Sequence, residues 1–199
     1  MAVTKALLPL VLQAALVGVL SAQTAPAIFA PSELYFGAEP TTVNPDWGCA
    51  NGSPFSCFSH QLFGVEAYVG ENQVWRQLGV EADARWLSWR GPVSGLKENS
   101  YEAGPSYRLV ARRGLAVTAD FKVGMGSITL PKGDGPGQGN YLIYSPSAHI
   151  EQRLTRALSV RCEYEYQLWP GFTGLKGNHG LTPNGFGVGV TYHPRTSIY

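Results

Sequence analysis

Ser147, His149 and Glu151 come nearest to a catalytic set in this chain. Residues two apart on a strand face the same side, so the hydroxyl and the imidazole could lie together near a carboxylate. Nucleophilic catalysis needs a base within hydrogen-bond reach of the hydroxyl and a third group that orients the base. Because a Ser and a His at strand spacing arise readily by chance, and a polar strand face explains the same residues, we assign no catalytic residue and predict a protein that is not an enzyme.

The histidines and cysteines do not form a metal-binding pattern. No CxxC occurs, and His60, His149, His179 and His193 are scattered along the chain. Closely spaced ligands would be needed to identify a metal site. We therefore predict no metal and no cofactor.

The polar residues instead follow a strict two-residue alternation. From Leu158 to Leu168 every second side chain is apolar, and the side chains between include Arg161, Glu163 and Glu165. Successive strand side chains face opposite sides of a sheet, so this segment has one apolar and one charged face. In a soluble barrel the apolar face would be buried, whereas in a membrane barrel it would meet lipid.

Eight segments have this strand character, and no helix-period pattern of useful length competes with them. Pro105 is unexpected within a central strand, because it cannot donate a ladder hydrogen bond. The predicted strands are about 32–42, 61–69, about 77–89, 100–111, 115–126, about 141–150, 157–169 and 185–192.

The connections between these segments alternate in length. Long links (43–60, 91–99, 127–140 and 170–184) alternate with short ones (70–76, 112–114 and 151–156). In an up-and-down meander the two kinds fall at opposite ends, as in outer-membrane barrels with short periplasmic turns and long outer loops. The basic residues Arg76, Arg112, Arg113, Arg153, Arg156 and Arg195 fall on the short-turn side.

Aromatic residues are expected to form two girdles near the strand ends, as at membrane interfaces. Ordinary core aromatics are the alternative explanation. The predicted girdle residues are Trp86, Trp89, Tyr101, Tyr166, Trp169 and Phe186 toward the long loops, and Tyr107 and Tyr192 toward the short turns.

The N-terminus has the three regions of a secretory signal peptide: Lys5, an apolar stretch from Ala6 to Leu20, and a small-residue segment. We predict a signal peptide over residues 1–27, cleaved between residues 22 and 27, and one β-barrel domain over residues 28–199. The net charge of +1 gives no reason to expect nucleic acid as a partner.

Export would place the cysteines in an oxidising compartment. Cys49 and Cys57 lie in a stretch rich in Gly, Asn, Ser and Pro, and we predict that they form one loop disulfide. Cys162 lies on the apolar face of a predicted strand, where it would act as a small hydrophobic residue.

The chain resembles the small bacterial outer-membrane β-barrels of the OmpA/OmpX and opacity-protein type. The resemblance rests on the exported N-terminus and on the stretches LGVEADARWLSW (78–89), SVRCEYEYQLWPG (159–171) and LTPNGFGVGVTY (181–192). It implies an all-β, eight-stranded, antiparallel up-and-down transmembrane barrel in the outer membrane, inserted by the outer-membrane machinery and monomeric. The family usually ends on an aromatic residue of the last strand, but here His193–Tyr199 follow Tyr192.

In such a barrel the charged face would line an interior just wide enough to be filled by side chains. Paired charges would then plug this interior, and the protein would have a structural or surface-interaction role carried by its long loops. Two alternatives stand beside this reading: a secreted soluble β-barrel that binds an apolar ligand, and an outer-membrane lipid-modifying enzyme. The predicted lumen network is Glu66, Glu81, Asp83, Arg85, Glu102, Arg108, Asp120, Lys122, His149, Arg161, Glu163 and Glu165.

Overall fold

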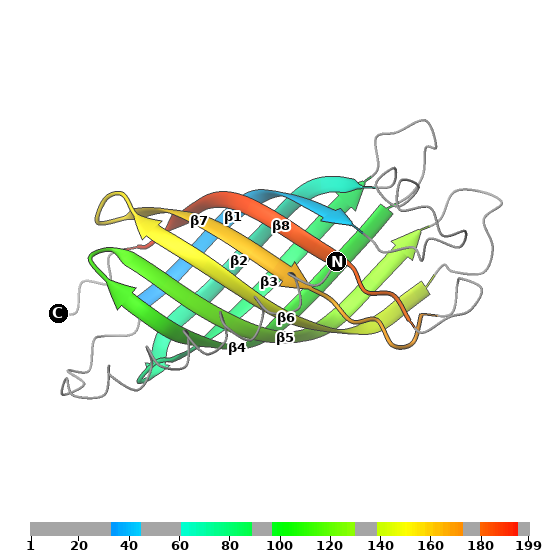
Figure 1. Cartoon of the computed structure of the whole chain (residues 1–199), viewed down its shortest axis with the longest axis horizontal. Helices are drawn as coiled ribbons and strands as arrows, with labels where there is room; N and C mark the ends of the chain where they lie inside the picture. The colour runs from blue at the N-terminus through cyan, green and yellow to red at the C-terminus, as the bar shows by residue number, and fades with distance from the viewer. Residues whose placement is uncertain (1–32, 45–60, 89–96, 130–138, 173–179, 195–199) are drawn as a thin grey trace, which may run out of the picture. The chain divides into compact units, whose positions relative to one another are not determined.

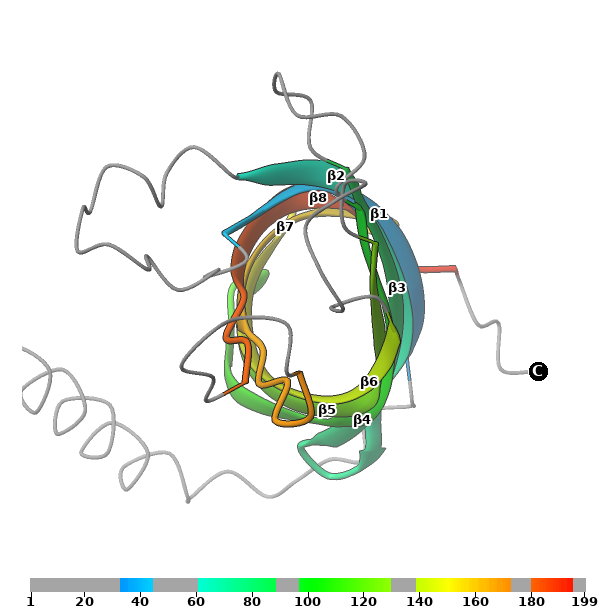
Figure 2. The same cartoon turned by 90° about the vertical axis from the view of Figure 1, so that its right-hand side faces the viewer.

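Eight antiparallel strands form a closed barrel in the computed structural model (Figure 1), which describes residues 33–44, 61–88, 97–129, 139–172 and 180–194. Each strand pairs with the next along the chain, and β8 pairs with β1 to close the ring (Figure 2). The predicted fold is therefore confirmed. The strands are β1 (Glu33–Asn44), β2 (Leu62–Trp75), β3 (Leu78–Ser88), β4 (Lys97–Arg112), β5 (Leu115–Thr129), β6 (Gly139–Arg153), β7 (Leu158–Tyr166) and β8 (Asn184–Tyr192).

Apolar and polar residues alternate along the strands because successive side chains face opposite sides of the wall. The apolar set faces outward: Phe63 on β2 is 51% exposed and Phe121 on β5 is 50% exposed. The intervening polar side chains, such as Glu66 and Lys122, are buried inside the barrel. A soluble barrel with an apolar ligand site would need the opposite facing.

The two ends of the barrel differ in their connections (Figure 1). Three tight turns, at Arg76–Gln77, Arg113–Gly114 and residues 154–157, lie at one end, which we call the hairpin end. The longer connections after β1, β3, β5 and β7 lie at the other, the loop end. Arg113 and Gly114 have φ values of 52° and 83°, the backbone of a type I′ hairpin turn.

Most strands extend further than the sequence indicated. β2 continues to Trp75, well past the predicted end at residue 69, through a register irregularity between Glu71 and Trp75. β7 ends earlier, at Tyr166. Pro105 lies within β4, opposite Val80 of β3, and the pairing of β4 with β5 continues on either side of it.

The outer wall carries most of the predicted girdle residues. Trp86 donates its indole N–H to the hydroxyl of Tyr101 at 3.2 Å, and both side chains are exposed. Tyr107 and Tyr192 are exposed toward the hairpin end. Trp169 is the exception described below, and Trp89 lies outside the described residues.

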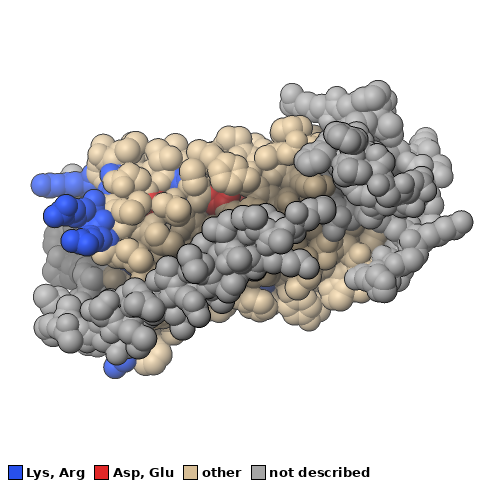
Figure 3. All heavy atoms as spheres, viewed as in Figure 1, with Lys and Arg blue, Asp and Glu red and all other residues tan. Residues whose placement is uncertain are grey.

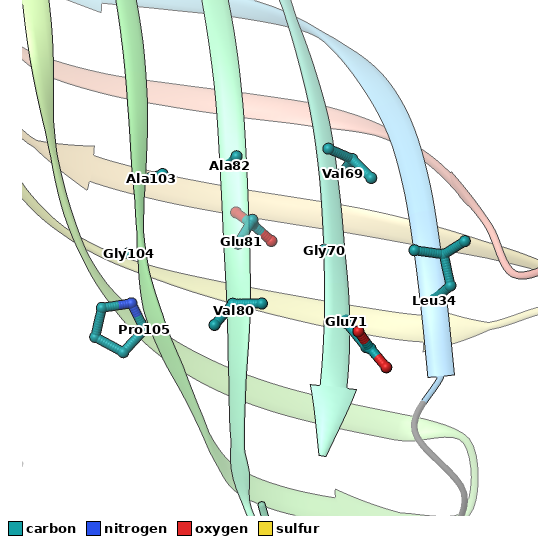
Figure 4. A pocket seen from close by; sticks show the side chains of 10 residues that line it. All are labelled: Leu34, Val69, Gly70, Glu71, Val80, Glu81, Ala82, Ala103, Gly104 and Pro105. Atoms are coloured by element: carbon teal, nitrogen blue, oxygen red, sulfur yellow. The ribbon is translucent and has the colours of Figure 1, made fainter. Parts of the chain in front are cut away.

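A shallow hollow of about 640 Å³ lies in the outer wall across β1 to β4 (Figure 4). The short side chains of Ala82 and Ala103 leave space between the larger Leu34, Val69 and Val80.

No helix within the described part of the chain is long and apolar enough to cross a membrane.

Candidate functional site

The candidate site is the charged interior of the barrel. Of the predicted network, all members except Arg108 are buried: Glu66, Glu81, Asp83, Arg85, Glu102, Asp120, Lys122, His149, Arg161, Glu163 and Glu165. Arg108 is only half-buried, and it forms none of the ion pairs found among the described residues. The register between β4 and β5 shifts between Arg108 and Val110, which ends the regular alternation there.

Lys122 of β5 lies at the centre of the network. Its Nζ is 2.6 Å from Oδ2 of Asp83, 3.2 Å from Oε1 of Glu163, 3.1 Å from Oε2 of Glu165 and 3.6 Å from Oε1 of Glu81. The four carboxylates come from β3 and β7, neither of which pairs with β5. One ammonium group therefore links three separate strands across the interior.

Arg85 connects a second set of carboxylates. Its Nε and Nη2 donate to Oε2 of Glu66 at 2.8 and 2.6 Å, and its Nη1 donates to Oε1 of Glu165 at 2.7 Å. Charge-assisted hydrogen bonds of this kind are the stronger class in proteins. Because Glu165 also contacts Lys122, the two cations belong to one continuous network.

Arg161 holds Glu81 in a bidentate pair, with Nη1 to Oε2 at 2.7 Å and Nη2 to Oε1 at 2.8 Å. Its guanidinium also pairs with Glu163 and lies 4.1 Å from the ring centroid of Tyr68. Tyr35 donates its hydroxyl to Oε2 of Glu81 at 2.7 Å. The two tyrosines thus continue the network toward the hairpin end.

The buried charges do not balance within the described residues. Arg85, Lys122, Arg161 and the protonated His193 described below face ten buried acidic residues: Glu39, Glu66, Glu81, Asp83, Glu98, Glu102, Asp120, Glu151, Glu163 and Glu165. A buried carboxylate without a partner is costly, so this excess requires protons or water on part of the set. Both carboxylate oxygens of Glu98, for example, have no hydrogen-bond partner among the described residues.

Among the described residues, three groups of acidic or histidine side chains lie close enough together to bind a metal ion, but each already contacts a Lys or Arg side chain. Glu66, Asp83 and Glu165 approach one another within 4.8 Å, but Arg85 and Lys122 lie among them. The other two groupings, Glu39–Glu66–Glu163 and Glu81–Asp120–His149, likewise include partners of Arg85, Lys122 or Arg161. The side chains therefore do not fit an additional metal ion well.

The predicted chemistry-bearing residues do not form a triad. Nδ1 of His149 lies 2.9 Å from Oδ2 of Asp120, and Ser147 donates to the same oxygen at 3.5 Å. Asp120 therefore contacts both side chains, whereas nucleophilic catalysis would need the imidazole of His149 to accept a hydrogen bond from the hydroxyl of Ser147. Glu151 belongs to a different cluster at the hairpin end.

That second cluster surrounds His193, directly after β8. Nε2 of His193 lies 2.7 Å from Oε1 of Glu151 and 2.9 Å from Oγ of Ser159, and Nδ1 lies 3.3 Å from Oε1 of Glu33. Burial lowers the pKa of His193, but the bond to Glu151 and the contact with Glu33 outweigh it and raise the pKa to about 9. A histidine that is protonated near neutral pH cannot take a proton from Ser159.

An apolar cluster covers the loop end of the network. Trp169, predicted for the outer girdle, is instead fully buried here, which corrects that prediction. Beyond β7 the chain still follows the wall, because Leu168 pairs with Tyr144 of β6 and Trp169 pairs with Leu181. The alternation turns Trp169 inward on the same side as Gln167, and its indole N–H donates to Oε1 of Gln167 at 2.9 Å. This segment is orange in Figure 2. The cluster comprises Val43, Leu62, Leu87, Ile128, Ile143, Trp169, Phe172 and Leu181.

Several lumen residues were missed because they lie on a weakly patterned strand or just beyond the predicted strands. Glu39 is on the weakly patterned β1, Glu98 begins β4 in what looked like a loop, and Glu151 ends β6 in what looked like a turn. Extending the alternation by one or two positions from Ser100 and His149 would have found two of them.

The predicted disulfide between Cys49 and Cys57 and the signal peptide lie outside the described residues. Cys162 has a free thiol and lies on the outward face of β7, opposite Ile150 of β6 and Val188 of β8.

No protein-family profile and no curated protein matches this chain. Solved structures do. Neisserial surface protein A matches with a TM-score of 0.60 and 11% identity over 82% of this chain and 97% of that one. OprG from Pseudomonas aeruginosa matches with a TM-score of 0.52 and 10% identity, over 83% of this chain and 97% of that one. Ail, the attachment invasion locus protein of Yersinia pestis, matches with a TM-score of 0.50 and 14% identity, over 82% of this chain and 97% of that one. The chain therefore has the fold of the small outer-membrane β-barrels.

Proposed function

We propose that this chain is a monomeric bacterial outer-membrane β-barrel with a plugged lumen and a structural or surface-interaction role carried by its loop end. The observation that carries the proposal is the facing of the wall, apolar outside and charged inside. Such a wall is stable where hydrocarbon surrounds it, because antiparallel closure leaves no unpaired strand edge in lipid.

The outward face supports a membrane environment. Its middle zone is almost free of charged side chains in Figure 3, and Lys and Arg gather at the hairpin end. Exposed Phe, Val, Leu and Tyr side chains of this extent would be an aggregation hazard in water. Lipid contact accounts for them without a further partner.

The interior supports a plug. Lys122, Arg85 and Arg161 cross-link carboxylates from opposite sides of the barrel, and Trp169 with its apolar neighbours covers the network at the loop end. An eight-stranded barrel is filled by its own side chains. A steady path for ions or solutes is therefore not part of the proposed function.

The loop end is the part of the proposal that concerns interaction. The connections after β1 and β7 span residues 45–61 and 167–183, far more than a turn requires. Long connections on a rigid scaffold are where binding residues concentrate. The Yersinia pestis neighbour carries the name attachment invasion locus protein, which is compatible with such a role.

Membrane fractionation and gel migration with and without boiling test the barrel. We expect the protein in the outer-membrane fraction, with a faster-migrating unboiled form. A periplasmic or secreted protein whose migration does not depend on boiling would contradict the proposal and favour the soluble ligand-binding alternative.

Protease treatment of intact cells tests the placement of the two ends. With the loop end outside, cleavage should occur only in the long connections, and Arg112 and Arg153 should be cut only after the outer membrane is opened. Planar-bilayer recordings should show no steady conductance for the intact protein.

A further inference from the structure

Five arginines lie on the three hairpins at one end of the barrel. They are Arg76 after β2, Arg112 and Arg113 between β4 and β5, and Arg153 and Arg156 at the β6–β7 turn. All but Arg153 are exposed. At the loop end the described residues include a single exposed cation, Lys97. We call these five side chains the arginine collar.

Four members of the collar have free charges. Arg153 pairs with Glu33, but Arg76, Arg112, Arg113 and Arg156 form no ion pair among the described residues. Two other acidic residues lie near this end: Glu151 is buried against His193, and Glu71 of β2 is half-buried and forms no ion pair among the described residues. The collar thus presents unneutralised guanidinium groups, which prefer planar oxyanions such as phosphate.

Large apolar side chains stand beside these arginines. Trp75 is 60% exposed, and the guanidinium of Arg76 lies 5.4 Å from its ring centroid. Leu154, between Arg153 and Arg156, is 66% exposed, and Leu115 follows Arg113 and Gly114. A free polyanion would gain nothing from these apolar groups, whereas a phospholipid offers both a phosphate and a hydrocarbon boundary.

The backbone places two of the arginines at hairpin tips at some conformational cost. Arg76 and Arg113 have φ values of 59° and 52°, a region that Gly or Asn adopts more readily in such turns. A Gly or Asn would serve the turn better, so the turn alone does not explain an arginine at both tips.

We propose that the arginine collar binds the phosphate groups of anionic phospholipids and seats the hairpin end in the leaflet that contains them. The inference rests on the proposed membrane location and adds a lipid class and an orientation to it. Trp75 and Leu154 would enter the boundary of the acyl chains while Arg76, Arg113 and Arg156 reach the headgroup phosphates.

Lipid titration by native mass spectrometry tests the proposal. The folded full chain, released from detergent, is titrated separately with phosphatidylglycerol and phosphatidylcholine. Each cationic residue near such a surface changes binding about fivefold. The triple variant R76Q/R113Q/R156Q should therefore lose affinity for phosphatidylglycerol by a factor on the order of one hundred, and K97Q, at the opposite end, should bind as the parent does.

Competition distinguishes a lipid from a free anion. Inorganic phosphate should not displace phosphatidylglycerol at matched concentration, and W75A should weaken lipid binding without changing any binding of phosphate. If phosphate competes equally and W75A has no effect, the collar is a site for free anions and the lipid assignment is wrong.

The remaining outcomes are also decisive. A folded parent protein that binds the two lipids equally would overturn the collar while leaving the barrel proposal intact. If the parent protein shows no heat-modifiable form in vesicles of either lipid, both the collar proposal and the barrel proposal are wrong. If the triple variant does not fold, the parent's preference between the two lipids and the W75A comparison still decide the question.

Discussion

Nζ of Lys122 lies 2.6 Å from Oδ2 of Asp83, and the two residues come from strands that do not pair with each other. The contact therefore crosses the interior and does not follow the wall. With Glu163 and Glu165 on β7 also within 3.2 Å of the same nitrogen, Lys122 fixes the spacing of three strands. Removing this one charge should affect the whole barrel.

The first prediction concerns K122M, which keeps the volume of the side chain but removes its charge. Breaking a buried pair leaves uncompensated carboxylates, so the free energy of unfolding should fall by about 3–5 kcal/mol. Urea titrations in lipid vesicles measure it. K97M, at an exposed position on β4, is the control, and D83N added to K122M should recover part of the loss. A change below about 1 kcal/mol would show that the network contributes little.

The second prediction concerns the outward wall. A84R, V123R and V160R should each cost about 2–4 kcal/mol in a bilayer, and A111R, beside the β4–β5 turn at the hairpin end, about 0–1 kcal/mol. Titrations in vesicles again give the values. Equal costs at all four positions would contradict the proposed facing in the membrane.

Gly124 lies on the inward face of β5, on the same side as Lys122. An acid-rich lumen would accommodate an arginine there electrostatically, but a Cβ at this position would lie 2.0 Å from the carbonyl oxygen of Tyr101 on β4. Backbone atoms cannot move aside as the end of a side chain can. We therefore expect even G124A to destabilise the barrel, and Gly124 is unsuitable as a lumen control.

The third prediction concerns the apolar cover. A Cβ at Gly126 would lie 2.3 Å from Cη2 of Trp169, so G126V should displace the indole from the cluster. W169A should cost about 3–5 kcal/mol by leaving a cavity. W86A, which removes an exposed indole, is the matched control. Planar-bilayer recordings should show current only in the Trp169 and Gly126 variants, and their remaining silent would indicate that the charge network closes the lumen alone.

The strand cores and their facing could be predicted from the sequence because the period-two pattern is local. From Leu158 to Tyr166 every position faces as the alternation indicated. The same alternation, continued from Gln167, places Trp169 inward, but the space beside Gly126 that its indole fills could not be predicted from a local pattern. Sequence distance likewise hides the partners of Lys122, which lie about 40 residues away on either side and meet it only after closure.

The His193 cluster was hidden for a related reason. His193 lies one residue beyond the last strand, and its partners Glu33 and Glu151 lie at the far ends of two other strands. Only the closing of β8 against β1 brings these ends together. The alternation, continued from Thr191, turns His193 inward but does not show which side chains meet it there.

The fourth prediction concerns Cys162. Its thiol lies on the outward face between Ile150 and Val188 and would face hydrocarbon in the membrane. An apolar maleimide should label it in folded protein in vesicles, while a charged, water-soluble thiol reagent should label it only after unfolding. Peptide mass spectrometry assigns the labelled site. Rapid labelling of the folded protein by the charged reagent would place Cys162 in water.

The last prediction concerns His193 and pH. The pKa of this imidazole is raised from 6.5 to about 9 in the folded protein, because its bond to Glu151 and its contact with Glu33 outweigh the effect of burial. The protonated form is therefore favoured by folding. Its contribution is fully present below about pH 6.5, where the unfolded chain is also protonated, and is lost as pH rises to about 9.

With a pKa of 6.5 in the unfolded chain and about 9 in the folded protein, this loss should reach about 3 kcal/mol. Unfolding free energies measured from pH 6 to pH 10 should fall on the alkaline side in the parent protein and stay flatter in H193Q. E151Q removes the main stabilising partner of the imidazolium, so its alkaline decline should begin at lower pH. If H193Q and the parent decline in parallel, another group controls the alkaline limb and the cluster is only a packing contact between the chain after β8 and the ends of β1 and β6.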